Sequence, residues 1–170
     1  MAFPFQKVLR PLWLQHKRAS FAQISSSASD FTKGLVVGGT YTVERRFTAE
    51  DVSLYAKLCG DTNPIHTSKE AAKAANFEDC IVHGMLYAGL FPAIIGNRQP
   101  GAIYLTQTLR FRNTVSVGER ILAQVQVERI SGRRAVLTTT CSKNDPKSGG
   151  KDRIIVLEGS ALALLPRSQA

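Results

Sequence analysis

Residues 55–66 read Tyr-Ala-Lys-Leu-Cys-Gly-Asp-Thr-Asn-Pro-Ile-His and place a carboxylate and an imidazole, Asp61 and His66, five positions apart. A regular helix cannot continue through this stretch, because Pro64 has no backbone N–H and restricts the preceding residue to extended geometry. Gly60 relaxes the backbone directly before the acid. Two groups that can exchange protons are therefore presented from a stiff turn, as expected of a general acid–base pair.

A strand and a helix are predicted upstream of this turn. Residues 41–46 alternate in the manner of a short strand. Thr48 opens a helix, since Thr48-Ala-Glu-Asp51 resembles a capping box with aspartate in the glutamate position. The predicted buried stripe of this helix consists of Val52, Tyr55, Ala56 and Cys59. The helix delivers the chain directly to the turn.

A short helix, a long helix and four strands are predicted downstream. Ser68 caps the short helix, and the almost wholly apolar residues 85–95 predict a buried helix that ends or kinks at Pro92. The four strand-length stretches are residues 102–111, 120–129, 135–142 and 153–165. This order predicts an α+β fold in which an antiparallel sheet wraps around one long central helix.

The composition is that of an ordinary globular protein. The chain has 170 residues, of which 44% are hydrophobic and 21% charged, enough for one domain with a sizeable core. No apolar run approaches the roughly 18 residues that a membrane-spanning helix needs. The three cysteines are widely spaced and form no paired metal-ligand pattern, which predicts reduced thiols in an intracellular compartment. No metal and no cofactor are predicted.

Residues 1–30 predict an organellar transit peptide, which leaves residues 31–170 as the folded domain. The first 29 residues contain four basic and no acidic side chains, and residues 20–29 are rich in serine and alanine. This composition is typical of a transit peptide, whereas a secretory signal has a longer unbroken apolar run. The spread of basic residues beside an apolar leucine and tryptophan face favours the mitochondrial matrix over a plastid. A disordered or membrane-surface tail is the alternative.

The formal net charge is +9, and the four basic residues of the N-terminal segment account for four of these charges. The basic residues outside this segment could favour an acidic protein partner or an anionic ligand, or they could be only a solvated surface. The charges show no aromatic interleaving of the kind found in single-stranded nucleic-acid sites, so a nucleic-acid partner is not predicted.

Residues 55–66 resemble the signature of the R-specific enoyl-thioester hydratases, the MaoC-like branch of the hot-dog superfamily. Val82-His83-Gly84-Met85 is similar to the segment that begins the central helix of that family, and the strand order also matches. The resemblance covers roughly residues 34–165. It implies a hot-dog fold and a (3R)-hydroxyacyl-thioester dehydratase, which in reverse hydrates trans-2-enoyl thioesters.

The resemblance places the catalytic aspartate and histidine of the family on Asp61 and His66, and its oxyanion-hole glycine on Gly84. The chemistry agrees, because eliminating water requires removal of a weakly acidic Cα proton and protonation of a poor leaving group. A thioester carbonyl that becomes enolate-like also needs N–H donors, which a helix N-terminus supplies. Alone, Asp61 could merely cap its turn and His66 could be structural. The three matches together favour catalysis, with the acid and the base acting jointly.

Three further residues are predicted to bind substrate or to shape the turn. Asn63 holds the turn through an Asx-type bond or contacts the substrate. His83 packs at the entrance of the central helix or lines the thioester channel, and Tyr55 packs against the turn. Gly89 and Pro92 either shape an acyl tunnel or serve ordinary helix packing.

A transit peptide joined to one short hot-dog chain favours fatty-acid synthesis on acyl carrier protein. The acidic carrier would meet basic residues, and the candidate contacts are Arg110, Arg112, Arg133 and Arg134. The alternatives are the same reaction on coenzyme A thioesters, a hot-dog thioesterase, which would not require the Asp–Asn–Pro–His spacing, and a non-catalytic binding subunit. A single hot-dog unit exposes a sheet edge, so a homodimer is expected.

Overall fold

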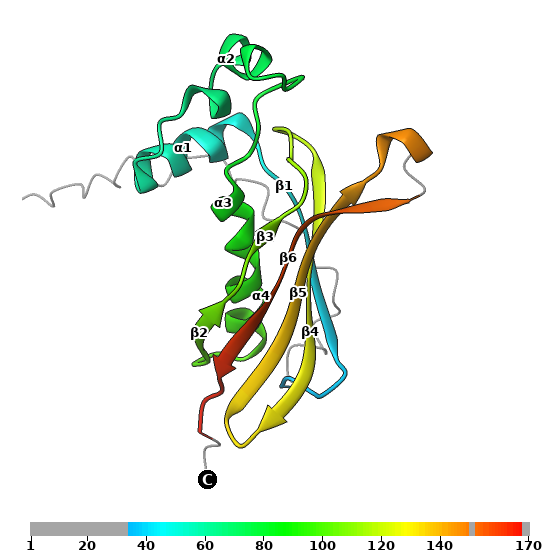
Figure 1. Cartoon of the computed structure of the whole chain (residues 1–170). Helices are drawn as coiled ribbons and strands as arrows, with labels where there is room; N and C mark the ends of the chain where they lie inside the picture. Colours follow the sequence, from blue (N-terminus) through cyan, green and yellow to red (C-terminus); the bar gives the residue numbers. More distant parts are fainter. Residues whose placement is uncertain (1–33, 150–151, 168–170) are drawn as a thin grey trace, which may run out of the picture.

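The structure is a computed structural model that describes residues 34–149 and 152–167 (Figure 1). The predicted transit peptide, residues 1–30, lies outside this range. Within the described residues no helix is long and apolar enough to cross a membrane.

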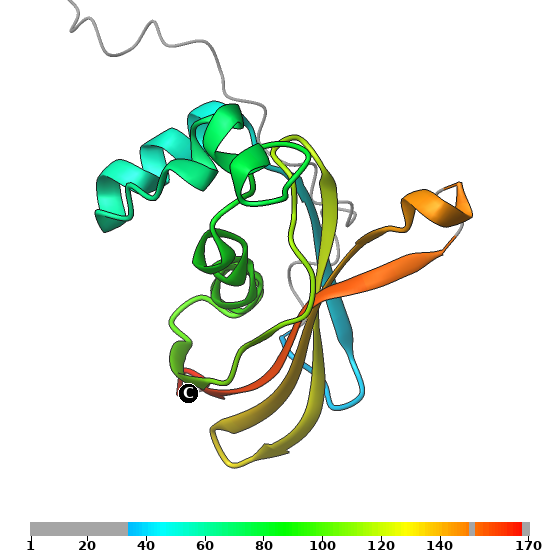
Figure 2. The same cartoon turned by 45° about the horizontal axis from the view of Figure 1, so that its top comes forward.

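In the described part of the chain, six strands form one antiparallel sheet with the order β1-β4-β5-β6-β2, and β3 pairs with β6. The strands are β1 (Thr40–Arg46), β2 (Ile103–Gln107), β3 (Arg110–Phe111), β4 (Arg120–Ser131), β5 (Arg134–Asn144) and β6 (Arg153–Leu164). The helices are α1 (Ala49–Cys59), α2 (Lys69–Ala74), α3 (Gly84–Ala88) and α4 (Leu90–Arg98), with short 3₁₀ turns at Pro64–His66 and Pro146–Ser148. The sheet curves around α3 and α4, which are seen nearly end-on in Figure 2. The predicted α+β hot-dog architecture is confirmed.

The core lies between the concave face of the sheet and the central helices. Alternate residues of β4 are fully buried, from Ile121 to Val127, and β5 repeats this pattern beside it. Phe91 and Ile95 of α4 belong to the same buried cluster. The period of two in the sequence therefore marks the face of the sheet that covers the helix.

The central helix is not one continuous segment. Its two parts, α3 and α4, are separated at Gly89, whereas the sequence predicted a kink or an end at Pro92. Pro92 instead lies in the first turn of α4, where a missing N–H costs little. The same missing N–H deprives the carbonyl of Ala88 of its helical donor, so the interruption falls one turn before the proline. The predicted all-round burial is also wrong, since Met85 is 56% exposed.

The predicted strand over residues 102–111 is divided into β2 and β3. Between them the backbone N–H of Thr108 donates to the carbonyl of Ser160, 2.8 Å away. Thr108 approaches Gly159 so closely that a Cβ on Gly159 would lie 1.8 Å from its carbonyl oxygen. Within β2 the ladder with β6 also shifts register between Tyr104 and Thr106, as at a β-bulge.

Helix α1 begins with the predicted capping box. The hydroxyl of Thr48 accepts from the N–H of Asp51 at 3.2 Å, and the Asp51 carboxylate accepts from the N–H of Thr48 at 3.0 Å. Val52 and Ala56 are buried as predicted. Cys59 is exposed, contrary to the prediction, because the end of α1 projects away from the sheet (Figure 2).

Candidate active site

The turn that follows α1 is held by its own polar groups. Gly60 ends the helix in the left-handed region, with φ of 79°, and its N–H donates to the carbonyl of Ala56 at 2.9 Å. The side-chain oxygen of Asn63 accepts from the N–H of Ile65 at 3.3 Å, which is the expected Asx-type bond. Pro64 then opens a 3₁₀ turn that ends at His66. These local constraints fix how far apart the acid and the imidazole lie.

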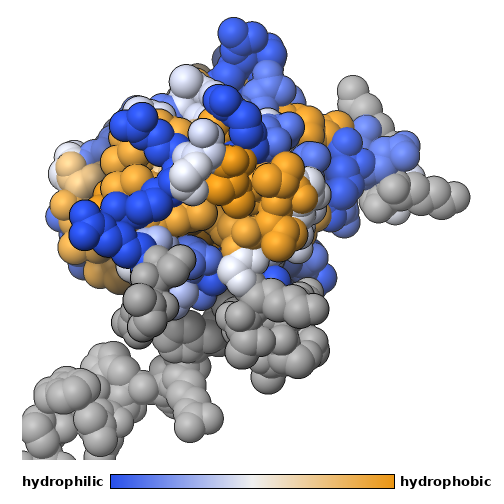
Figure 3. Space-filling model, turned by 90° about the horizontal axis from the view of Figure 1, so that it is seen from below, coloured by the Kyte–Doolittle hydropathy of each residue, from blue (hydrophilic) through white to orange (hydrophobic). Residues whose placement is uncertain are grey.

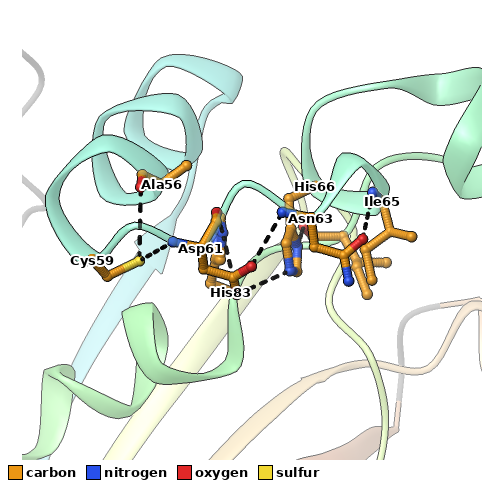
Figure 4. A network of polar contacts seen from close by, with 8 residues as sticks. Ala56, Cys59, Asp61, Asn63, Ile65, His66 and His83 are labelled. Carbon is orange, nitrogen blue, oxygen red and sulfur yellow. Dashed lines mark hydrogen bonds and ion pairs between the residues drawn. The ribbon is translucent and has the colours of Figure 1, made fainter.

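Asp61 and His66 face one another across this turn (Figure 4). Oδ1 of Asp61 accepts from the N–H of Asn63 at 3.2 Å, whereas Oδ2 lies 3.8 Å from Nε2 of His66. The side chain of Asp61 is 52% exposed and that of His66 is 10% exposed. Nδ1 of His66 lies 2.8 Å from the carbonyl oxygen of Ile81, which can only accept. We therefore assign the hydrogen to Nδ1, so that neutral His66 keeps a free lone pair on Nε2.

His83 packs against both members of this pair. It is 3% exposed and precedes α3 as its N-cap residue. Its Nε2 lies 3.2 Å from the backbone carbonyl of Asp61, and its ring stacks on that of His66 with centroids 3.7 Å apart. The ring of Tyr55 lies 5.1 Å from the ring of His83, on a plane tilted by 59°. The sequence had left the place of His83 open between helix packing and the thioester channel.

Cys59 is a contact of the site that the sequence analysis missed. Its sulfur accepts a hydrogen bond from the N–H of Asp61 at 3.4 Å. The helical pattern assigned Cys59 to the core, and only its position two residues before the acid indicated a local role. Cys80 and Cys141 are buried, and all three cysteines are free.

Gly84 is the first residue of α3 and lines a cavity of about 620 Å³ together with His66. The other lining residues are Ile81, Val82, Met85, Tyr87, Phe111, Arg112, Asn113 and Thr114. The volume is within the range of small-molecule sites. A Cβ at Gly84 would lie 2.5 Å from the ring of Phe111, so packing alone already excludes a larger residue at this position. Burial raises the pKa of Tyr87 to about 12, above its ordinary value of 10.0.

The four candidate arginines are divided into two pairs. Arg110 and Arg112 lie at β3, and Arg112 lines the cavity while its Nε donates to Glu158 at 2.9 Å. Arg133 and Arg134 lie in the β4–β5 hairpin. That hairpin is at one end of β4, and Arg120 is at the other end. Arg120 pairs with Arg46, where β1 leads into α1. Of the four arginines, Arg112 lines the cavity and Arg110 is its neighbour in the chain but not a lining residue.

Asp61, His66 and His83 each offer one ligand atom within 4.8 Å of the others. Their arrangement does not suit a tetrahedral metal site. The two rings are stacked with an interplanar angle of 24°, so their lone pairs do not converge on one point. His83 also uses Nε2 toward a carbonyl.

Comparison with known proteins shows the family of the chain. A model of the MaoC like domain matches residues 33–145. The mitochondrial 3-hydroxyacyl-(acyl-carrier-protein) dehydratase FERN of Solanum lycopersicum is 40% identical over 90% of this chain and 91% of its own length. An (R)-specific enoyl-CoA hydratase of Rhodospirillum rubrum is 35% identical over 76% of this chain and 87% of its own length.

A solved structure supports the same relationship. An (R)-hydratase from A. caviae involved in PHA biosynthesis superimposes with a TM-score of 0.70 at 36% identity, covering 78% of this chain and 98% of the other. The sequence match, the fold and the turn that carries Asp61 and His66 lead to one conclusion. The chain belongs to the MaoC-like domain family.

Proposed function

We propose that the chain is a (3R)-hydroxyacyl-thioester dehydratase, which in reverse hydrates trans-2-enoyl thioesters. The observation that carries the proposal is the 3.8 Å separation between Oδ2 of Asp61 and Nε2 of His66. It is too long for a direct hydrogen bond, but one oxygen atom can lie within hydrogen-bond distance of both groups. That oxygen is the hydroxyl of the substrate in dehydration and the attacking water in hydration.

In dehydration the pair removes the Cα proton and protonates the departing hydroxyl. The C–H electrons form the C=C bond, the C–O bond breaks, and the hydroxyl leaves as water. His66 has a free Nε2 lone pair because its Nδ1 is bonded to Ile81. Asp61 keeps Oδ2 toward His66, since Oδ1 accepts from Asn63. We favour joint action of the two residues, with both contacting the oxygen that moves.

The thioester oxygen becomes negatively charged as the Cα proton leaves. We assign its stabilisation to the backbone N–H of Gly84, which is in the first turn of α3 and so has no helical acceptor. Gly84 and His66 line the same cavity, which supports this role.

The thioester carrier that we propose is acyl carrier protein, in mitochondrial fatty-acid synthesis. The name of the tomato relative supports the carrier and the compartment. The proposal includes a transit peptide over residues 1–30, a hot-dog domain over residues 31–170 and a matrix location. Coenzyme A thioesters are the second candidate, supported by the name of the Rhodospirillum relative.

We propose that the active form of the protein is a homodimer. Strand β2 is at one edge of the sheet, and its Ile103 and Leu105 are 56% and 44% exposed. Apolar side chains gather on the face seen from below, toward the end at which β2 lies (Figure 3). Pairing of this edge with a second copy would remove an unpaired strand and cover apolar surface.

Hydration of trans-2-enoyl thioesters tests the function through the loss of conjugated absorbance. Carrier-bound and coenzyme A substrates are compared side by side over a series of chain lengths. Turnover on either class supports the thioester dehydratase, and the better class identifies the carrier. No turnover on both classes would contradict the proposal and favour a non-catalytic subunit.

A further inference from the structure

His83 contacts both members of the acid–base pair but is not among the side chains that line the cavity. We propose that His83 is a positioning residue that fixes the orientation of Asp61 and His66 through one directed N–H and one stacked ring. This inference rests on the proposed function, since it assigns a task within the same reaction.

The hydrogen of His83 belongs on Nε2. This nitrogen lies 3.2 Å from the backbone carbonyl oxygen of Asp61 and 3.9 Å from its Oδ2, and both oxygens are acceptors. Nδ1 of His83 is buried and has no hydrogen-bond partner among the described residues. A hydrogen on Nδ1 would therefore be a buried donor without an acceptor, which is costly. The neutral ring with its hydrogen on Nε2 satisfies both observations.

His66 has the opposite arrangement. Its Nδ1 donates to the carbonyl of Ile81 at 2.8 Å, which leaves the Nε2 lone pair free toward Asp61. The two stacked rings thus present one donor and one acceptor to the same aspartate. Only the acceptor, Nε2 of His66, can take a proton. His66 therefore exchanges the proton, and His83 provides a fixed N–H.

The turn needs this restraint because the carboxylate of Asp61 is held weakly, although its backbone N–H donates to the sulfur of Cys59. The side chain of Asp61 is 52% exposed, and among the described residues its carboxylate accepts only the N–H of Asn63, at 3.2 Å. The N–H of His83 orients the backbone of Asp61, and the His83 ring limits the plane of His66. Loss of His83 should therefore misalign the pair and lower kcat. KM should change little, because His83 does not line the cavity.

The test compares His83→Gln with His83→Asn. Both are neutral amides that remove the ring, but only glutamine places an amide nitrogen at the distance of imidazole Nε2. His83→Gln should retain kcat within about fivefold, whereas His83→Asn should lose about 10- to 100-fold, as for a small misplacement of catalytic groups. KM should stay within about twofold in both. Equal kcat in the two variants, or a change confined to KM, overturns the proposal.

Val127→Ala is the control for lost stability alone. Val127 is fully buried in β4, where it pairs with Gly39 before the start of β1 and not with the end of β1 that leads into α1, so this variant should lower Tm and keep kcat. Nitrogen-15 NMR of the wild-type protein tests the proposal even where variants fail to fold. We expect His83 as the Nε2–H tautomer and His66 as the Nδ1–H tautomer, and the same tautomer in both rings contradicts the proposal. Absence of turnover in the wild type would contradict the proposed function instead.

Discussion

At the residue scale, the carboxylate of Asp61 has a small part in folding, since half of it is exposed and it makes one local hydrogen bond. We therefore expect Asp61→Asn to fold, and we expect both Asp61→Asn and His66→Gln to lower kcat by about 10²- to 10⁴-fold, the range for loss of a general acid or base. Circular dichroism checks the fold, and turnover of an enoyl thioester gives kcat. Near-normal turnover in either variant would remove that residue from the mechanism.

Two buried acids predict how stability responds to alkaline pH. Burial raises the pKa of Tyr87 and of Cys141 to about 12, from reference values of 10.0 and 9.0. Between pH 9 and 12 the unfolded chain releases protons that the folded chain retains. Stability is therefore fully present below pH 9 and falls as the pH rises toward 12.

Urea unfolding at a series of pH values from 8 to 11 measures this fall as a decrease in the midpoint. Burial also raises the pKa of Tyr104, so several groups contribute to the decrease. Cys141→Ala should make the decrease shallower, since it removes one of them. A midpoint that is constant up to pH 11 would contradict the assignment of these protons.

At the element scale, α1 carries the turn, and its N-terminal capping box holds its first residues. Thr48→Ala removes the acceptor for the N–H of Asp51 and should lower the free energy of unfolding by about 1 kcal/mol. Thr48→Ser keeps a hydroxyl and is the matched control. Urea unfolding measures both. An equal loss in the two variants would show that the methyl group of Thr48, and not the cap, stabilises this helix.

The elements that local patterns govern were predictable from the sequence. The box at Thr48 predicted the start of α1, and alternation predicted β4 and β5 to within a few residues. The interruption at Gly89 was predicted three residues too late, at Pro92. The sequence shows the position of the proline, but the helix is interrupted near the carbonyl of Ala88, which loses its N–H donor. The exposure of Cys59 depends on where α1 leaves the sheet, which its own sequence does not contain.

The candidate site was predictable only in part for a similar reason. Within one turn Asp61 accepts from the N–H of Asn63, and the N–H of His66 donates to the carbonyl of Asn63. The stack of His66 on His83 joins residues from separate elements, so it depends on how α3 packs beside the turn. The spacing of residues within one segment cannot reveal such a contact.

At the scale of the whole molecule, the division of the arginines decides where an acidic carrier can dock. Arg110 directly precedes Phe111, which lines the cavity, and Arg134 is in the distant β4–β5 hairpin. Arg110→Glu should lower kcat/KM on carrier-bound substrate by roughly tenfold, through slower association. Arg134→Glu makes the same change of charge and should have little effect.

A small enoyl thioester without the carrier provides the reference for this experiment. Arg110→Glu should leave its turnover unchanged, and the effect on carrier-bound substrate should shrink as salt is added. An equal loss on both substrates would assign Arg110 to the cavity itself and not to the docking of the carrier.

The two edges of the sheet offer different places for a second copy, and single charges can distinguish them. Leu105→Lys puts a charge on β2 at the proposed interface, where burial in a dimer would be costly. It should give a monomer in sedimentation. Val37→Lys is the matched control, because Val37 is 60% exposed and precedes β1 at the opposite edge. It should remain a dimer. If Val37→Lys dissociates the protein while Leu105→Lys does not, the interface is at β1. The proposed pairing through β2 would then be wrong.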